Sequence, residues 1–320
     1  MKFIVFGAGA VGGVVGARLA QSGHDVVLIA RGTHYEALKA SGLRLRSPDD
    51  DVTLDVAVAR SPAEVSIDEG DVVLLAVKSH DTPAALDALA AAAPGGTAVV
   101  CLQNGVDNER AALRVFPNVY GICVMCPTTH LVPGEVRAHS APVTGILDIG
   151  RYPSGTDGTA EAVARALTMS TFISEPRPDI MRWKYAKLLM NLANAVEAVC
   201  GPPAAGPLTE LVRREGVACL RAAGIDFVPD EEDRARRGDT VKILPVAGEP
   251  HGGGSSWQSM ARGVGSIETD YLNGEITLLG RLAGVPTPAN AALQRAAIDL
   301  ARERRPPGSI SQEELLSRLG

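Results

Sequence analysis

The glycines at positions 7, 9 and 12 restrict the fold of this chain more than any other residues, because they directly follow the apolar run at residues 2–6. They form the pattern G-x-G-x-x-G and open an apolar-periodic stretch at residues 10–22. In such a unit the first glycine permits a tight turn, the second lets the backbone approach a pyrophosphate, and the third allows close helix–strand packing. The helix N-terminus attracts the anion. The sequence therefore predicts a dinucleotide site formed by Gly7, Ala8, Gly9, Ala10, Val11 and Gly12.

Three further apolar runs, at residues 25–30, 71–77 and 97–101, alternate with helical stretches that include residues 80–93. The runs lack polar alternation, which is typical of strands that are buried on both faces. This strand–helix alternation predicts an N-terminal Rossmann-type, doubly wound parallel sheet. The same reading predicts strands that extend or flank this sheet at 118–126, 135–139 and 144–149, then a helix at 158–168 and a strand at 171–174.

The second half of the chain is predicted to be helical, with helices at residues 178–200, 206–223, 256–283 and 287–303. A length of 320 residues also suggests two domains. We therefore expect an α/β protein with a cofactor-binding Rossmann domain at 1–176 and an all-α substrate domain at 177–320. Residues 228–255 carry a charge run and end in three glycines, which favours a mobile loop or a solvated linker. Ser311, three residues before Glu314, predicts a capped terminal helix.

Composition argues against several classes of protein. The net charge is −6, with 31 Lys and Arg against 37 Asp and Glu, and aromatic residues make up 4%, so we expect no nucleic-acid partner. Apolar runs fall short of the ~20 residues that a membrane span needs, and the N-terminus lacks a signal-peptide pattern. The five cysteines lack disulfide spacing and predict free thiols in a reducing cytoplasm. Cys123 and Cys126 have no second pair, so we expect core thiols and no metal site.

The residue after the second strand bears on the choice of cofactor. NAD sites usually place a carboxylate there, whereas this strand ends in Ala30 and is followed by Arg31. An arginine offers a planar fork of donors to a 2′-phosphate, so residues 1–176 are predicted to bind NADP. A solvated loop arginine is the alternative. Lys78 and Asn104 also follow predicted strands and are expected to approach the cofactor, although Asn104-Gly105 could serve only as a turn.

A polar stripe marks the first predicted helix of the second half. Lys187, Asn191 and Asn194 are spaced i, i+4 and i+7, which places them on one face of a helix with about 3.6 residues per turn. A lysine and two amides inside an apolar helix are costly unless they meet polar partners, which makes them site candidates. Lys184 is a rival, but it has Leu188 at i+4 and is predicted to be a surface residue.

Taken together, these motifs resemble those of the ketopantoate reductase family, and the resemblance covers nearly the whole chain. It rests on the glycine loop, Ala30-Arg31-Gly32, Val77-Lys78, Gln103-Asn104-Gly105, Pro133-Gly134-Glu135-Val136, Lys187 with Asn191, Ser255-Ser256, and the stretch from Glu268 to Asn273-Gly274. The resemblance implies a Rossmann domain, a helical C-terminal domain and NADPH as cofactor. It further implies reduction of ketopantoate (2-dehydropantoate) to pantoate, a step towards pantothenate and coenzyme A.

Residue roles also follow from the resemblance. Lys187 matches the catalytic lysine and Glu268 the acidic residue near the reacting oxygen, which also borders the cofactor. Asn191 and Ser256 match substrate-binding residues, and Asn194 is a candidate to join them. Asn104 matches an asparagine between the nicotinamide ribose and the substrate, while Arg31 and Lys78 match cofactor contacts.

This chemistry is reasonable on physical grounds. Reduction of a 2-oxo acid by hydride builds negative charge on the ketone oxygen, and a protonated lysine can stabilise that charge and deliver a proton. A free lysine has a pKa of about 10.4 and so carries its proton at neutral pH. We expect the substrate in the cleft between the two halves, and a homodimer could form through the helical half.

Two positions depart from the family pattern. Ala195 and Gly253 stand where the family usually has asparagine. Both missing amides would touch the substrate, so a reductase of a different small 2-oxo acid is the first alternative. A non-catalytic NADP-binding regulator is a weaker alternative, because a sensor has no need of Lys187 and Glu268.

Overall fold

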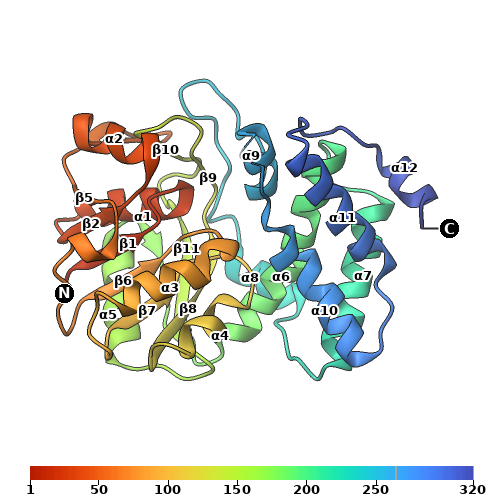
Figure 1. The fold of residues 1–320 in the computed structure, drawn as a ribbon, viewed down its shortest axis with the longest axis horizontal. Helices are drawn as coiled ribbons and strands as arrows, with labels where there is room; N and C mark the ends of the chain where they lie inside the picture. The colour runs from red at the N-terminus through yellow and green to blue at the C-terminus, as the bar shows by residue number, and fades with distance from the viewer. Residues whose placement is uncertain (264, 320) are drawn as a thin grey trace. The chain divides into compact units, whose positions relative to one another are not determined.

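The computed structural model describes residues 1–263 and 265–319. They form two compact units, which divide differently from a single cut in the chain (Figure 1). The first, here called the N-terminal unit, contains Met1–Lys184 and Glu231–His251. The second, called the helical unit, contains Tyr185–Asp230 and Gly252–Gly320. The chain therefore passes from one unit to the other at three points.

The main sheet of the N-terminal unit has the strand order β12-β11-β8-β7-β6-β1-β2-β5. Neighbouring strands are parallel except for β11 and β8, which run antiparallel. Strand β1 lies between β2 and β6, as expected of a doubly wound sheet. This confirms the predicted fold class. The strands are β1 (Phe3–Phe6), β2 (Val26–Ile29), β5 (Ala57–Ala59), β6 (Val72–Leu75), β7 (Ala98–Cys101), β8 (Asn118–Met125), β11 (Gly145–Arg151) and β12 (Phe172–Ile173).

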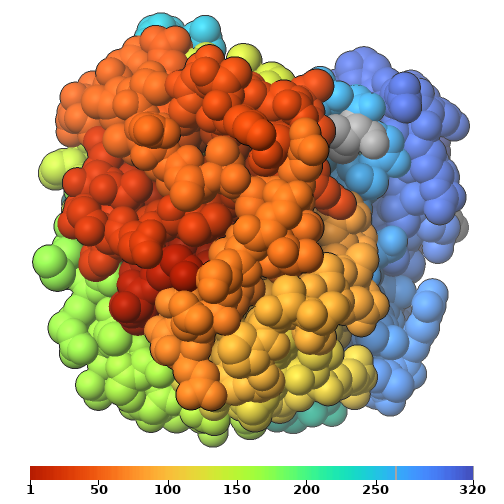
Figure 2. Space-filling model, turned by 60° about the vertical axis from the view of Figure 1, so that its left-hand side comes forward, coloured from red at the N-terminus to blue at the C-terminus, as the bar shows by residue number. Residues whose placement is uncertain are grey.

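Helices cover both faces of this sheet because its central strands are apolar on both sides. Phe3 and Val5 of β1 face a core that includes α1 (Ala10–Gln21) and α5 (Gly158–Met169). Ile4 and Phe6 face the opposite core, formed with α3 (Thr82–Ala90) and α4 (Asn108–Leu113). In Figure 2 the orange to yellow segments that contain α3 and α4 cover one side of the unit. A further helix, α2 (Gly32–Ser41), packs near β5.

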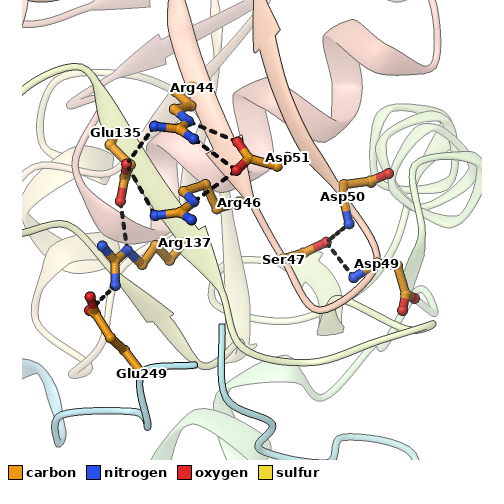
Figure 3. A network of polar contacts seen from close by, with 9 residues as sticks. All are labelled: Arg44, Arg46, Ser47, Asp49, Asp50, Asp51, Glu135, Arg137 and Glu249. Carbon is orange, nitrogen blue, oxygen red and sulfur yellow. Dashed lines mark hydrogen bonds and ion pairs between the residues drawn. The ribbon is translucent and has the colours of Figure 1, made fainter. Parts of the chain in front are cut away.

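A second, small sheet with the order β4-β3-β10-β9 packs against α1. It consists of β3 (Leu43–Arg46), β4 (Asp51–Leu54), β9 (Thr128–Thr129) and β10 (Glu135–Ala138). Leu43 and Leu45 are buried, whereas Arg44 and Arg46 between and after them join an ion-pair network on the other face (Figure 3). This Leu-Arg alternation lies outside the predicted strands, although a period of two is the signal of a half-buried strand.

The segment predicted as a loop at 228–255 belongs largely to the N-terminal unit and contains α8 (Asp230–Arg237). Between α8 and α9 (Ser255–Ala261) the chain has no helix or strand, so the loop prediction is wrong only for α8. Its charge run pairs along the helix, as between Asp233 and Arg237, whose atoms lie 2.7 Å apart. Arg236 fixes α8 to the sheet through the Asp148 carboxylate at 2.6 Å. Further along, the Leu244 amide donates to the His139 carbonyl at 2.7 Å.

The helical unit is formed by the end of α6 (Ile180–Cys200) together with α7 (Pro207–Ala222), α9 (Ser255–Ala261), the 3-10 turn η3 (Glu268–Tyr271), α10 (Asn273–Ala283), α11 (Pro288–Arg302) and α12 (Gln312–Ser317). The prediction of one helix over 256–283 is wrong. Gly263 and Gly265 have φ values of 62° and 78°, which a continuing right-handed helix does not allow. The predicted cap is confirmed, because the Glu314 amide donates to Ser311 Oγ at 3.1 Å. Among the described residues, no helix is long and apolar enough to cross a membrane.

Candidate functional site

The residues predicted to bind a cofactor follow four adjacent strands at one edge of the main sheet. In the register of the sheet, Phe6 pairs with both Ile29 and Leu75, and Leu75 pairs with Cys101, so the four strands end level. The glycine loop, Arg31, Lys78 and Asn104 come after these ends. Ligands of doubly wound sheets bind at this carboxyl edge, next to the strand where the order reverses.

The three motif glycines meet different surroundings. Gly7 has a φ of 109°, and a Cβ placed on it would lie 2.7 Å from the Val77 amide nitrogen. A Cβ on Gly12 would overlap the Gly7 carbonyl oxygen. A Cβ on Gly9 would meet no atom within 4 Å. The fold itself therefore requires glycine at positions 7 and 12, whereas at position 9 it leaves open space.

The start of α1 suits an anion. Its N-cap, Gly9, has no side chain to accept a capping hydrogen bond, and the first turn carries no acidic residue. The positive end of the helix dipole and the first amides thus remain without a side-chain cap. These features fit the pyrophosphate of a dinucleotide.

His34 of α2 ties the glycine loop to a distant turn, which the sequence analysis did not foresee. The Gly134 amide donates to His34 Nδ1 at 2.9 Å, and His34 Nε2 lies 2.7 Å from the Ala8 carbonyl. Since Nδ1 accepts, the proton of the neutral ring is on Nε2 and points to Ala8. Burial lowers the pKa of His34, which favours this neutral form. Gly134 belongs to the Pro133-Gly134 motif, so the two motifs lie together.

Arg31 forms an ion pair that the sequence analysis also did not foresee. Its guanidinium lies 2.8 Å from the Asp81 carboxylate. Asp81 ends the 3-10 turn η2 (Ser79–Asp81), which begins directly after Lys78. The Arg31 side chain is 73% exposed and Asp81 37%, so solvent reaches both charges.

Buried amides and hydroxyls connect the segments that follow β6 and β7. We call Ser79, Thr82, Gln103 and Asn108 the carboxyl-edge network. Gln103 Nε2 donates to the Val77 carbonyl at 2.8 Å and to Thr82 Oγ1 at 2.9 Å. Thr82 Oγ1 in turn donates to Asn108 Oδ1 at 2.8 Å. The network therefore links the segment of Lys78 with that of Asn104.

Lys184 lies beside this network, and its prediction as a surface residue is wrong. Its side chain is 2% exposed, and Nζ lies 2.6 Å from Oε1 of the fully buried Glu109. It also donates to the Gln103 carbonyl at 2.9 Å and to the Ile122 carbonyl at 3.2 Å. Burial raises the pKa of Glu109, and the charge of Lys184 opposes that rise. Lys184 therefore fixes the start of α6 by three acceptors.

The helical unit contains the predicted catalytic residues and, apart from Asn104, the predicted substrate-binding residues. Lys187 and Asn194 of α6 are half-buried, and Asn191 on the same helix is buried. Glu268 in η3 and Ser256 in the first turn of α9 are also buried. Within the described residues, the hydroxyl of Ser256 has no hydrogen-bond partner. A buried polar atom of this kind calls for a ligand or a water to satisfy it.

Gly254, just before α9, brings Asn194 close to this serine-bearing turn. A Cβ on Gly254 would lie 3.2 Å from Asn194 Oδ1. The Gly254 amide donates to Glu197 Oε2 at 2.8 Å. Glu197 was not predicted, although it follows Asn194 on the helix at i+3. Asn194 therefore lies next to the start of α9.

Arg262 is a further residue that sequence reasoning missed. Burial lowers the pKa of its guanidinium, and the negative charge of Glu268 raises it in opposition. Glu268 therefore has a cation near it in its own unit. Among the described residues, no group of three His, Cys, Asp or Glu side chains could hold a metal ion.

Comparisons with known proteins agree with this arrangement. A family model described as ketopantoate reductase PanE/ApbA matches residues 3–154, and the model of its C-terminal domain matches residues 179–300. The chain is 30% identical to a 2-dehydropantoate 2-reductase of Mesorhizobium japonicum, over 95% of this chain and 99% of that protein. It is 31% identical to one of Caulobacter vibrioides, over 90% and 94%.

Solved structures show the same similarity. A PanE/ApbA family ketopantoate reductase from Ralstonia eutropha JMP134 is 32% identical, with a TM-score of 0.79 over 95% of this chain and 99% of that one. A D-mandelate dehydrogenase solved with NADH and anilino(oxo)acetate has the same TM-score at 21% identity, which shows a shared fold. Both halves of the chain are thus covered by family models and by close structural relatives. The chain belongs to the ketopantoate reductase family and is a nicotinamide-dependent oxidoreductase that acts on CH–OH groups.

Proposed function

We propose that this protein reduces 2-dehydropantoate (ketopantoate) to pantoate with NADPH. The observation that carries the cofactor part of the proposal is the space at Gly9, where the fold does not need a glycine but an approaching pyrophosphate does. Family membership and the names of the relatives, 2-dehydropantoate 2-reductase, support the substrate.

The N-terminal unit would hold the cofactor. The loop from Gly7 to Gly12 would bind the pyrophosphate through backbone amides, with Lys78 close to the phosphates or a ribose. Arg31 would pair with the 2′-phosphate, for which its planar fork of donors is suited. When bound, the nicotinamide supplies a hydride to the keto carbon of the substrate.

The helical unit would supply the groups that act on the substrate. We assign Lys187 as the proton donor to the ketone oxygen, because a lysine ammonium both stabilises the developing charge and carries a proton. Glu268 would orient that ammonium. Asn191, Asn194 and the Ser256 hydroxyl would donate hydrogen bonds to the substrate, and Asn104 would bridge substrate and nicotinamide ribose.

One observation favours a second candidate, reduction of a different small 2-oxo acid. Gly253, where the family usually has asparagine, has a φ of 126°, and a Cβ there would lie 2.8 Å from Trp257 Cγ. An amide side chain therefore does not fit at this position without a change of the local backbone. Ala195 is the second position where the family usually has asparagine. The substrate pocket would therefore lose two amide donors.

The substrate is tested by following NADPH oxidation with ketopantoate and a panel of branched and hydroxylated 2-oxo acids. We expect the highest kcat/KM with ketopantoate. A tenfold higher value with another acid would establish the second candidate instead. No oxidation with any acid would overturn both.

The cofactor site is tested by Gly9→Ala. Since the new methyl group meets no protein atom, the fold should persist while NADPH affinity falls at least about tenfold. Gly95→Ala is the matched control, because its Cβ also meets nothing within 4 Å. Equal NADPH affinity of the two variants would argue against the proposed site.

Two further substitutions separate the assigned roles. Lys187→Ala should lower kcat by several orders of magnitude and leave NADPH binding intact, and a wild-type rate would refute the proton-donor role. Arg31→Ala should weaken NADPH far more than NADH. An equal loss for both cofactors would refute the contact with the 2′-phosphate.

We also propose that the enzyme works in the cytoplasm as a homodimer. The five free thiols suit a reducing compartment. On α10 of the helical unit, Leu278 and Leu282 lie one turn apart and are 48% and 76% exposed, which suits a contact between two copies. Light scattering during gel filtration should give twice the mass of one chain, and cell fractionation should place the activity in the cytoplasm.

A further inference from the structure

Asn108 is a buried amide at the first residue of α4, immediately beyond the Asn104 turn. Its Nδ2 donates to the Asn104 carbonyl at 3.1 Å and to Ser79 Oγ at 3.2 Å. Its Oδ1 accepts from Thr82 Oγ1 at 2.8 Å. The amide oxygen and both N–H groups of this side chain therefore have partners on three different residues.

These partners belong to the segments that carry two of the proposed site residues. Ser79 directly follows Lys78, and Thr82 begins α3 three residues later. The third partner is the backbone of Asn104 itself. A single side chain thus holds the two segments at a fixed distance at the carboxyl edge of the sheet.

The direction of the hydrogen bonds makes the network specific. Gln103 Nε2 donates to Thr82 Oγ1, so the proton of the Thr82 hydroxyl is free to point to Asn108 Oδ1. Asn108 and Thr82 are each 2% exposed, so water does not readily replace a lost partner. An unsatisfied buried polar group is destabilising, which holds the amide in one orientation.

We propose that Asn108 is a positioning residue for the reductase reaction, setting Asn104 and Lys78 in the geometry that the cofactor and substrate require. The inference rests on the proposed function. Catalysis is sensitive to such positioning, because a displacement of about 1 Å at the reacting groups can cost ~100-fold in rate.

The experiment compares Asn108→Ala with Asn104→Ala and the double variant, using kcat with NADPH and the best 2-oxo acid. We expect Asn108→Ala to lower kcat by about 10–100-fold. With NADPH saturating, the same change in the Asn104→Ala background should lower kcat less than about threefold, because Asn104 is already absent and the displaced Lys78 then weakens only NADPH binding. A purely structural role predicts the full loss in both backgrounds, and that result would overturn the proposal.

Asn118→Ala serves as the control. Asn118 also donates through its amide to a backbone carbonyl, that of Gly96 at 2.9 Å, but at the start of β8. Its kcat should stay within about twofold of wild type. If Asn108→Ala also stays within twofold, the proposal is wrong.

A pair of variants at Thr82 keeps the test valid if Asn108→Ala does not fold. Thr82→Val removes only the hydroxyl that joins Asn108 and Gln103, whereas Thr82→Ser keeps it. We expect Thr82→Val to lower kcat at least about fivefold and Thr82→Ser to restore most of it. Equal kcat values for the two would overturn the proposal.

Failure of the proposed function gives a different pattern. In that case none of the 2-oxo acids in the panel supports NADPH oxidation by the wild-type protein. The inference is then decided by NADPH titration, where Asn108→Ala should bind at least about threefold more weakly than Asn118→Ala, because Lys78 is displaced. Equal affinities would overturn it.

Discussion

Two polar networks of the N-terminal unit join strands and loops in opposite ways. The surface network on the small sheet consists of charged groups, with Arg44, Arg46 and Arg137 around Asp51 and Glu135 (Figure 3). The carboxyl-edge network consists of neutral amides and hydroxyls and has the buried Lys184–Glu109 pair beside it. One network faces water, whereas the other is enclosed.

The two networks also differ in whether another group can take over when one contact is lost. Glu135 lies within 4.0 Å of three arginines, at 2.6 Å from Arg137 and 3.7 and 3.8 Å from Arg44 and Arg46. Loss of one arginine leaves two, and water and salt screen the rest. In the carboxyl-edge network the Gln103–Thr82 and Thr82–Asn108 hydrogen bonds are buried, so water does not readily replace a lost partner. We therefore expect substitutions to cost more at the carboxyl edge, where the proposed site residues lie, than on the small sheet.

The largest effect is expected from Lys184→Met, which removes the cation from the enclosed region. Breaking a buried ion pair leaves an uncompensated charge, so the free energy of unfolding should fall by about 3–5 kcal/mol. Urea titration of wild type and variant measures this. Lys184→Met with Glu109→Leu should recover most of the loss, because no buried charge remains. A loss below about 1 kcal/mol for the single variant would place the pair with the surface contacts.

The pH dependence of that variant provides a second measurement. Burial already raises the pKa of Glu109 above its ordinary 4.5, and without Lys184 it should rise further. The folded state then binds more protons than the unfolded state, so stability falls as pH rises above 4.5. Lys184→Met should therefore be relatively more stable in acid than at neutral pH, and the double variant should lack this dependence.

Asp148→Asn should have an effect on stability between that of the buried Lys184–Glu109 pair and that of the surface network. Asp148 is 2% exposed and accepts from Arg236 Nε at 2.8 Å and from the Glu175 amide at 2.9 Å. An asparagine of the same size offers one acceptor fewer, and the unfolding free energy should fall by about 1–3 kcal/mol. Asp179→Asn is the control, because its ion pair with Arg182, three residues on at the start of α6, is partly exposed. Equal losses for the two variants would remove the distinction by burial.

The sequence predicted local features well and long-range partners poorly. The glycine loop and the strands β1, β2, β6 and β7 follow from patterns that lie within a few residues. Lys184 and Lys187 are three positions apart on one helix, so periodicity alone hardly separates them. What distinguishes them is Glu109, which comes from α4.

Network residues were missed for the same reason. Asn108 has an ordinary local explanation, since polar residues are common at helix starts. Its partners Ser79 and Thr82 come from another crossover of the sheet. In the small sheet, the Leu-Arg alternation of β3 is a local signal and the strand at 135–139 was predicted, but the pairing of β3 with β10 joins distant parts of the chain. Such contacts depend on how the elements pack, which no short window of sequence contains.

A smaller effect is expected at the Arg31–Asp81 pair, which resembles the surface network but lies at the carboxyl edge. The exposed pair should add little to stability, so Asp81→Asn should leave the unfolding free energy nearly unchanged. It should tighten NADPH binding by about two- to fivefold, because Asp81 no longer competes with the 2′-phosphate for the Arg31 guanidinium. NADH affinity should not change. In an Arg31→Ala background the gain should disappear, and a gain that persists there would contradict this coupling.

The smallest effect is expected at Asp51→Asn, in the middle of the surface network. Hydrogen bonding from Arg44 lowers the pKa of Asp51 below its ordinary 3.8. A carboxyl whose pKa is lower in the folded state contributes stability above that ordinary value, and the contribution is lost as pH falls through the folded value. The midpoint of thermal unfolding at pH 7 should therefore shift by no more than about 2 °C. The difference between variant and wild type should shrink below pH 3.8 and at high salt, because acid and ions each remove the same charge interaction. A shift as large as that of Asp148→Asn would mean that exposure does not separate the two networks.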